Sequence, residues 1–178
     1  LRGMPMFAAG MSVAAELLAA IDRSGEVLGD GDVVVLAQKI VSKAEGRLVR
    51  LADLTPGEEA QRIARETGRD PAGVQAILGE SAAILRAMPA AIIARHRTGH
   101  VLANAGIDAS NVEGGDEGTV LLWPVDPDAS ARTIRLEIER LAGVRPAVVI
   151  ADSMGRAWRI GTVGAAIGCA GLAVLDDQ

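Results

Sequence analysis

Apolar residues recur with the spacing of a helix near the start of the chain. After Ser12 they stand at Val13, Leu17 and Ile21, and Gly25 follows the end of the pattern. A hydroxyl side chain before the first turn satisfies free amide groups of a helix, and glycine is favoured just beyond the last turn. The spacing therefore predicts a first helix that begins after Ser12.

Further helices are predicted from their start signals. Thr55-Pro56-Gly57-Glu58 opens a helix that runs through Ala64. Asp70-Pro71 opens another, because aspartate caps a helix and proline suits its first position. Asp126-Pro127-Asp128 precedes a last helix, whose apolar stripe consists of Ile134, Ile138 and Leu141.

Short apolar runs bounded by turn residues predict strands between these helices. Val33 to Ala37 is a continuous apolar run that is rich in β-branched valine and too short for a helix, which predicts a buried strand. The strands and helices do not alternate strictly, so we expect a mixed α+β fold rather than a doubly wound parallel sheet. The other predicted strands are Ala91 to Ala94 and His100 to Ala103, joined by a hairpin-like turn, then Thr119 to Trp123 and Ala147 to Ile150.

Composition narrows the class of protein. Of 178 residues, 49% are apolar and 23% charged, so the chain can bury a sizeable core as one large domain or two small intimate ones. With one Phe and two Trp, that core must consist of Ala, Val, Leu and Ile. A net charge of -5 disfavours nucleic acid and anionic membranes as partners. Cys169 is the only cysteine, which excludes an internal disulfide and fits a reducing cytoplasm.

The two ends of the chain suggest a longer gene product. The chain begins without Met and ends at Asp176-Asp177-Gln178, directly after an apolar run. That run, Val163 to Leu175, contains three glycines and is shorter than the roughly 20 residues that a membrane-spanning helix needs. We therefore expect no membrane span, and a single domain over residues 1–178 that is truncated at its C-terminus and slightly at its N-terminus.

Three polar segments each follow a predicted strand, where ligands commonly bind. Lys39 and Lys43 could neutralise phosphate oxygens, although most lysines simply face solvent. Asp108 stands among Asn104, Ser110 and Asn111, whose oxygens suit Mg²⁺ or Mn²⁺ but also form turns without a ligand. The third segment is Asp152-Ser153 followed by Arg156 and Arg159, which could hold metal and phosphate or form a cap and salt bridges.

Other catalytic patterns are missing from the sequence. The chain has neither the Gly-rich loop of P-loop proteins nor the dinucleotide fingerprint of Rossmann folds, and it has no serine nucleophile elbow. His96 and His100 flank Thr98-Gly99, which predicts a turn, so we interpret both histidines as structural.

Four segments together resemble one known family. Gln38 to Arg47, Asn104 to Asn111, Asp126 to Ser130 and Asp152 to Arg159 are similar, in this order, to the coenzyme F420-0:L-glutamate ligases. The resemblance extends over essentially the whole chain, including Gly3-Met4-Pro5. It implies a GTP-dependent, GDP-forming enzyme that joins the carboxylate of the F420 precursor to L-glutamate, and that can extend a γ-linked tail.

The resemblance also implies a set of cofactors, partners and site residues. Family members bind divalent metal, Mg²⁺ or Mn²⁺, with K⁺ as a further cation, and form intertwined cytoplasmic homodimers that bind GTP between subunits. By position, the metal ligands are Asp108, Asp152 and Ser153. The GTP contacts are Met4, Pro5, Met6, Phe7, Gln38, Lys39, Lys43 and Asn111.

Two departures from the family pattern leave alternatives open. Family members continue past this point with an acidic, Gly-containing segment, and Gln38 stands where many have a small hydroxyl residue. One alternative is a truncated module that binds GTP and dimerises without turnover. Another is a phosphohydrolase that uses the same aspartates with a metal. No general base can be assigned from the sequence.

Overall fold

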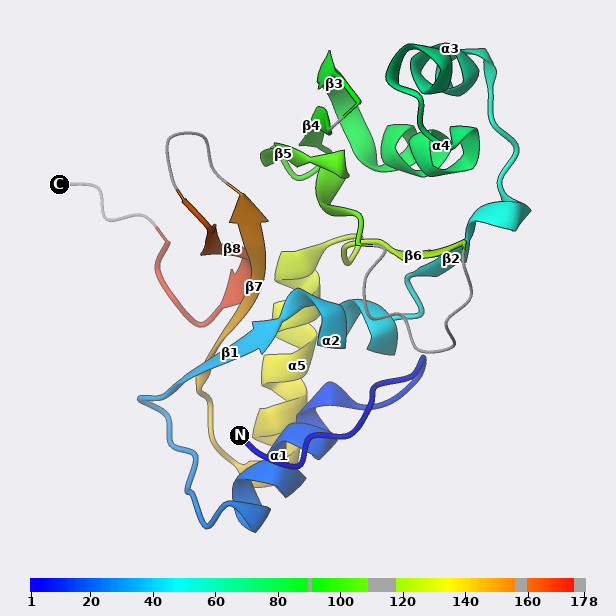
Figure 1. Ribbon diagram of the computed structural model, residues 1–178. Helices are drawn as coiled ribbons and strands as arrows, with labels where there is room; N and C mark the ends of the chain where they lie inside the picture. The colour runs from blue at the N-terminus through cyan, green and yellow to red at the C-terminus, as the bar shows by residue number, and fades with distance from the viewer. Residues whose placement is uncertain (90, 109–117, 156–159, 175–178) are drawn as a thin grey trace, which may run out of the picture. The chain divides into compact units, whose positions relative to one another are not determined.

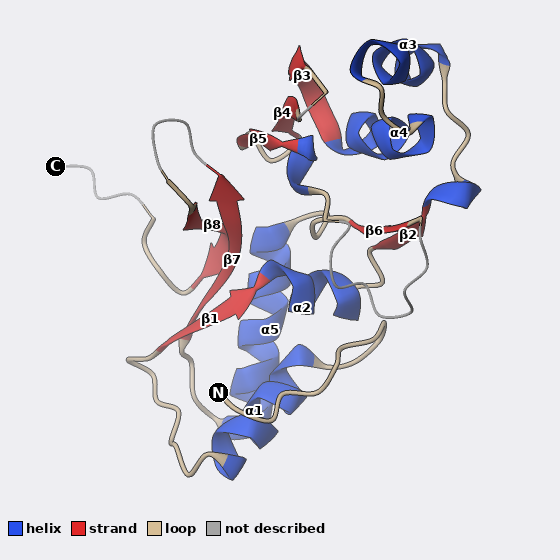
Figure 2. Cartoon of the chain, in the orientation of Figure 1, coloured by secondary structure: helices blue, strands red, loops and turns tan. Residues whose placement is uncertain are grey.

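The computed structural model describes residues 1–89, 91–108, 118–155 and 160–174 (Figure 1). The chain forms two compact units, each made of separate stretches of sequence. Unit 1 consists of Leu1–Gly46, Pro124–Asp152 and Ala165–Gln178, and unit 2 of Arg47–Trp123 and Ser153–Gly164. Helices and strands mix without regular alternation, which confirms the predicted α+β class (Figure 2).

Unit 1 combines two packed helices with a sheet in the strand order β1-β7-β8. Strands β1 and β7 are parallel, with Val34 opposite Val148, Leu36 opposite Ile150 and Ala37 opposite Ala151. The boundary between the units falls within β7 and β8. The elements are α1 (Val13–Arg23), β1 (Val33–Ala37), α2 (Gln38–Ala44), α5 (Pro127–Ala142), β7 (Ala147–Gly155) and β8 (Thr162–Ala170).

The predicted helix starts of unit 1 are confirmed. Ser12 caps α1 by accepting from the amide of Ala15 at 3.0 Å, and Asp126 caps α5 by accepting from that of Ala129 at 2.8 Å. The stripe of α5 is confirmed at Ile134 and Ile138, which are buried, and is wrong at Leu141, which is 45% exposed.

Strand β1 is buried on one face only, where its continuous apolar run predicts a buried strand. Val34 and Leu36 are buried, whereas Val33 and Val35 are 50% and 65% exposed. Side chains alternate between the faces of a strand, so an unbroken apolar run does not by itself show that both faces are covered. Val33 and Val35 instead line a cavity of about 540 Å³ in unit 1, together with Leu17, Ile21 and the N-terminal residues Leu1 and Met4.

Unit 2 contains a helix pair, a three-stranded antiparallel sheet β3-β4-β5 and a two-stranded pair β2-β6. The predicted hairpin is confirmed, since the His96 amide donates to the His100 carbonyl at 2.8 Å. The elements are β2 (Leu48–Arg50), the 3-10 turn η1 (Leu51–Asp53), α3 (Glu58–Thr67), α4 (Pro71–Glu80), β3 (Ser81–Ala87), β4 (Ile92–His96), β5 (Val101–Ala103), the 3-10 turn η2 (Asn104–Gly106) and β6 (Thr119–Leu121).

The core of unit 2 is aliphatic, as the composition predicts. Helices α3 and α4 contribute Ile63, Val74 and Ile77, which pack together with Ile92 of β4 and Ala105 of η2. Asp70 caps α4 at the predicted place, accepting from the amide of Gly73 at 2.7 Å.

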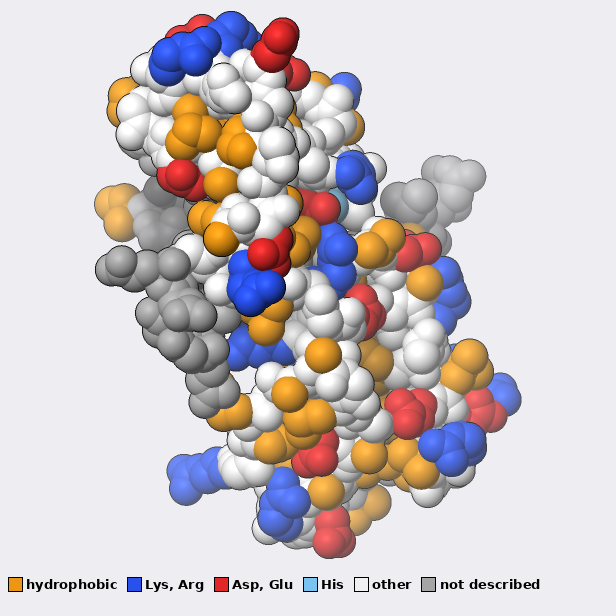
Figure 3. Space-filling model, turned by 90° about the vertical axis from the view of Figure 1, so that its right-hand side faces the viewer, with side chains coloured by type: hydrophobic (Ala, Val, Ile, Leu, Met, Phe, Trp, Pro, Cys, Tyr) orange, Lys and Arg blue, Asp and Glu red, His pale blue; other side chains and the backbone are white. Residues whose placement is uncertain are grey.

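Two features of the surface and the helices bear on possible partners. On the face drawn in Figure 3, acidic and basic side chains are interspersed rather than gathered by sign. Over the described residues, no helix combines the length and the apolar character that crossing a membrane requires.

Candidate active site

The parallel pairing of β1 with β7 brings two of the predicted site residues together within unit 1. The last pair of the parallel register is Ala37 opposite Ala151, so Gln38 and Asp152 are each one position beyond it. Asp152 continues the side of β7 that carries the buried Ile150, and Gln38, the first residue of α2, is itself buried. The carboxyl edge of parallel strands is a common place for ligands, because loops and helix starts meet there.

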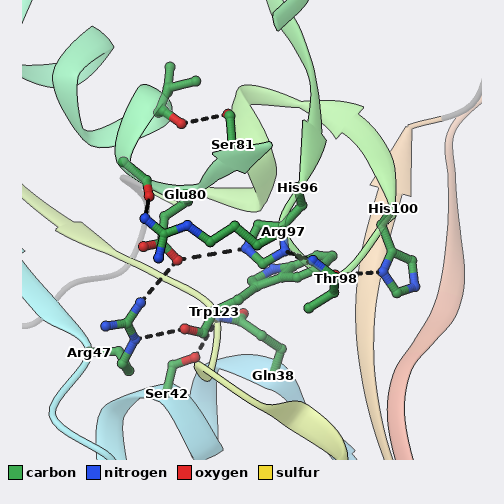
Figure 4. A network of polar contacts seen from close by, with 12 residues as sticks. Gln38, Ser42, Arg47, Glu80, Ser81, His96, Arg97, Thr98, His100 and Trp123 are labelled. Atoms are coloured by element: carbon green, nitrogen blue, oxygen red, sulfur yellow. Dashed lines mark hydrogen bonds and ion pairs between the residues drawn. The ribbon is translucent and has the colours of Figure 1, made fainter. Parts of the chain in front are cut away.

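The residues directly after β1 form the helix α2. In α2, Gln38 is 2% exposed and donates through Nε2 to Ser42 Oγ at 2.8 Å (Figure 4). Lys43 lies in the last turn and is 9% exposed, whereas Lys39 is half-buried. The interpretation of Lys43 as a solvated surface lysine is therefore wrong.

Asp152 and Ser153 lie inside β7 rather than after it, because the strand extends to Gly155. Apolar residues predict the strand only as far as Ile150, and the polar residues continue the same extended backbone. Neighbouring side chains of a strand point to opposite faces. Asp152 is accordingly half-buried, while Ser153 is exposed.

Asp108 is held in unit 2 by an isolated bridge to Leu121 of β6. The amide of Asp108 donates to the Leu121 carbonyl at 3.1 Å, and the amide of Leu121 donates back at 2.8 Å. Because Asp108 belongs to unit 2 and Asp152 to unit 1, a meeting of their carboxylates around one cation remains a prediction.

Unit 2 also contains a buried polar network that sequence reasoning missed (Figure 4). Arg47 donates through Nη2 to Glu80 Oε2 at 2.9 Å and through Nε to the Trp123 carbonyl at 2.8 Å. His96 is 2% exposed, and its Nε2 lies 3.7 Å from the same Glu80 oxygen. The network joins four separate segments of unit 2, with Glu80 at the end of α4 and His96 at the end of β4, and no short motif links its members in the sequence.

The hairpin after β4 extends this network to His100. The Thr98 amide donates to His96 Nδ1 at 3.1 Å, which places the ring proton of a neutral His96 on Nε2, facing Glu80. The Thr98 hydroxyl lies 2.9 Å from His96 Nδ1 and 2.8 Å from His100 Nδ1. Both imidazoles contact the Trp123 ring, at centroid distances of 4.8 Å and 5.5 Å. These contacts agree with the interpretation of both histidines as structural.

The charge on Glu80 should make unit 2 sensitive to acid. Burial alone would raise the pKa of Glu80, but the nearby imidazole of His96 and the charge of Arg47 outweigh it and hold this pKa below its ordinary value of 4.5. A depressed carboxyl pKa stabilises the fold above the unfolded value, and this stability is lost as pH falls through the folded value. We expect the free energy of unfolding to fall steeply below pH 4.5.

Urea unfolding at a series of pH values measures this contribution. Glu80→Gln should flatten the acid limb of the curve, because the neutral amide has no charge to lose. Glu66→Gln is the matched control, since Glu66 pairs with Arg62 at 2.8 Å but is 53% exposed on its side chain. An acid limb that is unchanged in Glu80→Gln would contradict the assignment.

The N-terminal segment Met4 to Phe7 is only partly enclosed. Phe7 is buried and Met4 lines the 540 Å³ cavity, whereas Met6 is 57% exposed. Arg23 of α1 donates through Nη2 to the Gly3 carbonyl at 2.9 Å, which fastens the segment to α1. None of these contacts involves a nucleotide, so the GTP contacts expected at Met4 to Phe7 remain a prediction.

Comparison with known families decides which family the chain belongs to. Residues 3–178 match the family described as F420-0:Gamma-glutamyl ligase. The chain belongs to this ligase family. The family resemblance inferred from the four polar segments is thereby confirmed.

Relatives of the ligase family match along nearly the whole chain. It is 46% identical over 176 residues to the coenzyme F420:L-glutamate ligase of Methanothermobacter thermautotrophicus, covering 99% of this chain and 69% of that protein. The same-named proteins of Archaeoglobus fulgidus and Methanopyrus kandleri are 43% and 45% identical, over 98% and 85% of this chain. The chain spans 67% and 59% of their lengths.

The ligase family implies a divalent cation, and the donor atoms of the described residues show whether this chain could bind one. Within the described ranges, no three His, Cys, Asp or Glu side chains gather as a metal centre. Asp108 and Asp152 supply carboxylate oxygens, the ligands that Mg²⁺ and Mn²⁺ prefer. Their chemistry fits the cation. Asn111 and the Arg156 to Arg159 segment lie outside the described residues.

Proposed function

We propose that this protein is a GTP-dependent ligase that joins the carboxylate of F420-0 to the amino group of L-glutamate. The main support for this proposal is the 46% identity, over 99% of the chain, with a protein named coenzyme F420:L-glutamate ligase. We extend the proposal to further γ-linked glutamates, to a cytoplasmic homodimer and to K⁺ as an additional cation, which rest on the family resemblance alone.

The proposed reaction needs an activated carboxylate. A carboxylate does not condense with an amine at neutral pH, so GTP first transfers its γ-phosphoryl group to form an acyl phosphate and GDP. The glutamate amine then attacks the acyl carbon, and phosphate leaves. Charge develops on phosphoryl oxygens in the first step, and fixed cations stabilise such charge.

The chain's own residues support these steps as follows. Lys39 and Lys43 bring positive charge to the helix that follows β1, close in sequence to Gln38. A bound Mg²⁺ or Mn²⁺ would supply Lewis-acid stabilisation of the phosphate charge, held by Asp108 and Asp152. Since β7 directs the Ser153 side chain away from that of Asp152, we infer that Ser153 would contribute to the same cation through its backbone carbonyl.

Mass spectrometry of the products tests the proposal directly. The intact protein is incubated with F420-0, GTP, L-glutamate and Mn²⁺, and we expect F420-0 to gain a glutamyl group only when GTP is present. Release of phosphate that neither F420-0 nor glutamate stimulates would instead favour the phosphohydrolase. Binding of GTP without turnover would favour the non-catalytic module.

A further inference from the structure

The turn that leads into Asp108 has an unusual backbone. Asn104, Ala105 and Gly106 follow one another with φ values of 53°, 51° and 72°. The left-handed region suits glycine, tolerates asparagine and is unfavourable for alanine. Strained backbone persists only where its surroundings leave it no alternative, and it is concentrated at functional sites.

Contacts from three other parts of unit 2 hold this turn. Asn104 Oδ1 accepts from Arg69 Nη1 at 3.0 Å and from the amide of Ile92 at 3.2 Å. On the other side, Gly106 lies close to the indole of Trp123, because a Cβ atom on Gly106 would come within 2.5 Å of Trp123 Cε2. Trp123 is 0% exposed and contacts both histidine rings, so the indole has little room to move.

A displacement of Gly106 would be transmitted to Asp108. Ile107 is the only residue between them, and it packs against both hydrophobic clusters of unit 2. Asp108 is fixed on its other side by the paired hydrogen bonds to Leu121, two residues before Trp123. Trp123 and the preceding strand β6 therefore define the place of Asp108 from both directions.

We propose that Gly106 and Trp123 are positioning residues for Asp108, whose carboxylate they hold in the orientation that receives the divalent cation. The inference rests on the proposed function, because it assumes that Asp108 is a metal ligand. It adds that the strength of cation binding depends on the close approach of the Gly106 backbone to the indole of Trp123. Neither residue touches the cation.

Titration of the intact protein with Mn²⁺, followed by electron paramagnetic resonance, tests the role of Gly106. Gly106→Ala should raise the Mn²⁺ dissociation constant by about 10- to 100-fold, the range found when outer groups that orient ligands are lost. Gly68→Ala is the matched control, since Gly68 has a φ of 67° and no atom within 4 Å of an added Cβ. It introduces the same backbone strain without the indole contact and should leave Mn²⁺ binding unchanged.

A double-mutant cycle separates positioning from general destabilisation. Trp123→Phe shortens the ring that the alanine methyl would strike, so Gly106→Ala should weaken Mn²⁺ binding much less in that background. If Gly106→Ala does not fold alone, Asn104→Gly provides a second variant. It keeps the left-handed backbone but removes the acceptor of Arg69 and Ile92, and it should also raise the dissociation constant.

The outcomes distinguish this inference from the proposed function. Wild-type protein that does not bind Mn²⁺ would overturn both. Wild-type binding together with unchanged binding in Gly106→Ala or Asn104→Gly would overturn the positioning role alone. Gly106→Ala could also weaken Mn²⁺ binding equally in the wild-type and Trp123→Phe backgrounds. That result would overturn the positioning role too, because the indole would then have no part in the effect.

Discussion

Ligation by the intact protein should be nearly abolished when either Asp108 or Asp152 is replaced by asparagine. Asparagine keeps the size of the side chain but removes the negative charge that we propose holds the cation. We expect turnover to fall by about 100- to 1,000-fold or more, the loss seen when one electrostatic stabiliser of a transition state is removed. Glutamylated F420 formed per minute, followed by mass spectrometry, measures the effect.

Asp53→Asn is a suitable control for these two variants. Asp53 is 58% exposed on its side chain and pairs with Arg50 at 3.0 Å on the surface of unit 2. Its replacement removes one carboxylate of the same kind and should leave turnover unchanged. Full activity in Asp108→Asn or Asp152→Asn would show that the metal assignment is wrong.

The largest loss of stability should come from Trp123→Ala. The side chain is fully buried, and it contacts His96, His100 and the backbone of Gly106. Truncating a buried aromatic residue to alanine costs about 3–5 kcal/mol, because apolar contacts are lost and a cavity remains. Urea unfolding followed by circular dichroism measures the change.

The other tryptophan falls outside the described residues, so an exposed aliphatic residue provides the comparison. Leu136 of α5 is 61% exposed, and Leu136→Ala should change the free energy of unfolding by less than about 0.5 kcal/mol. A loss in Trp123→Ala as small as that in Leu136→Ala would mean that the indole does not support unit 2.

Local signals in the sequence predicted the helices well. Ser12, Asp70 and Asp126 each cap the expected helix, because capping depends on residues only three positions apart. Strands were harder to predict. Strand β3 begins at Ser81, directly after α4 and without any turn residue, and β2 has only three residues.

The sequence suggested residues for the candidate site, but it did not predict the backbone that carries them. The polar segments identified the family, yet the helical backbone at Gln38 and the strand at Asp152 follow from tertiary pairing that apolar patterns do not record. The Glu80 network could not be predicted, since Arg47, His96 and Trp123 are brought to it by the fold.

The hydrogen bond from Arg47 to the Trp123 carbonyl has a consequence for the order of folding. It joins the first and last residues of the Arg47–Trp123 stretch, which makes up most of unit 2 and is translated before α5. Once this stretch has folded, its first and last residues are held together. The parts of the chain that carry α1 and α5 then start from neighbouring points. The entropy of bringing these distant helices together is then already lost, so docking of α5 onto α1 should be the late, fast step.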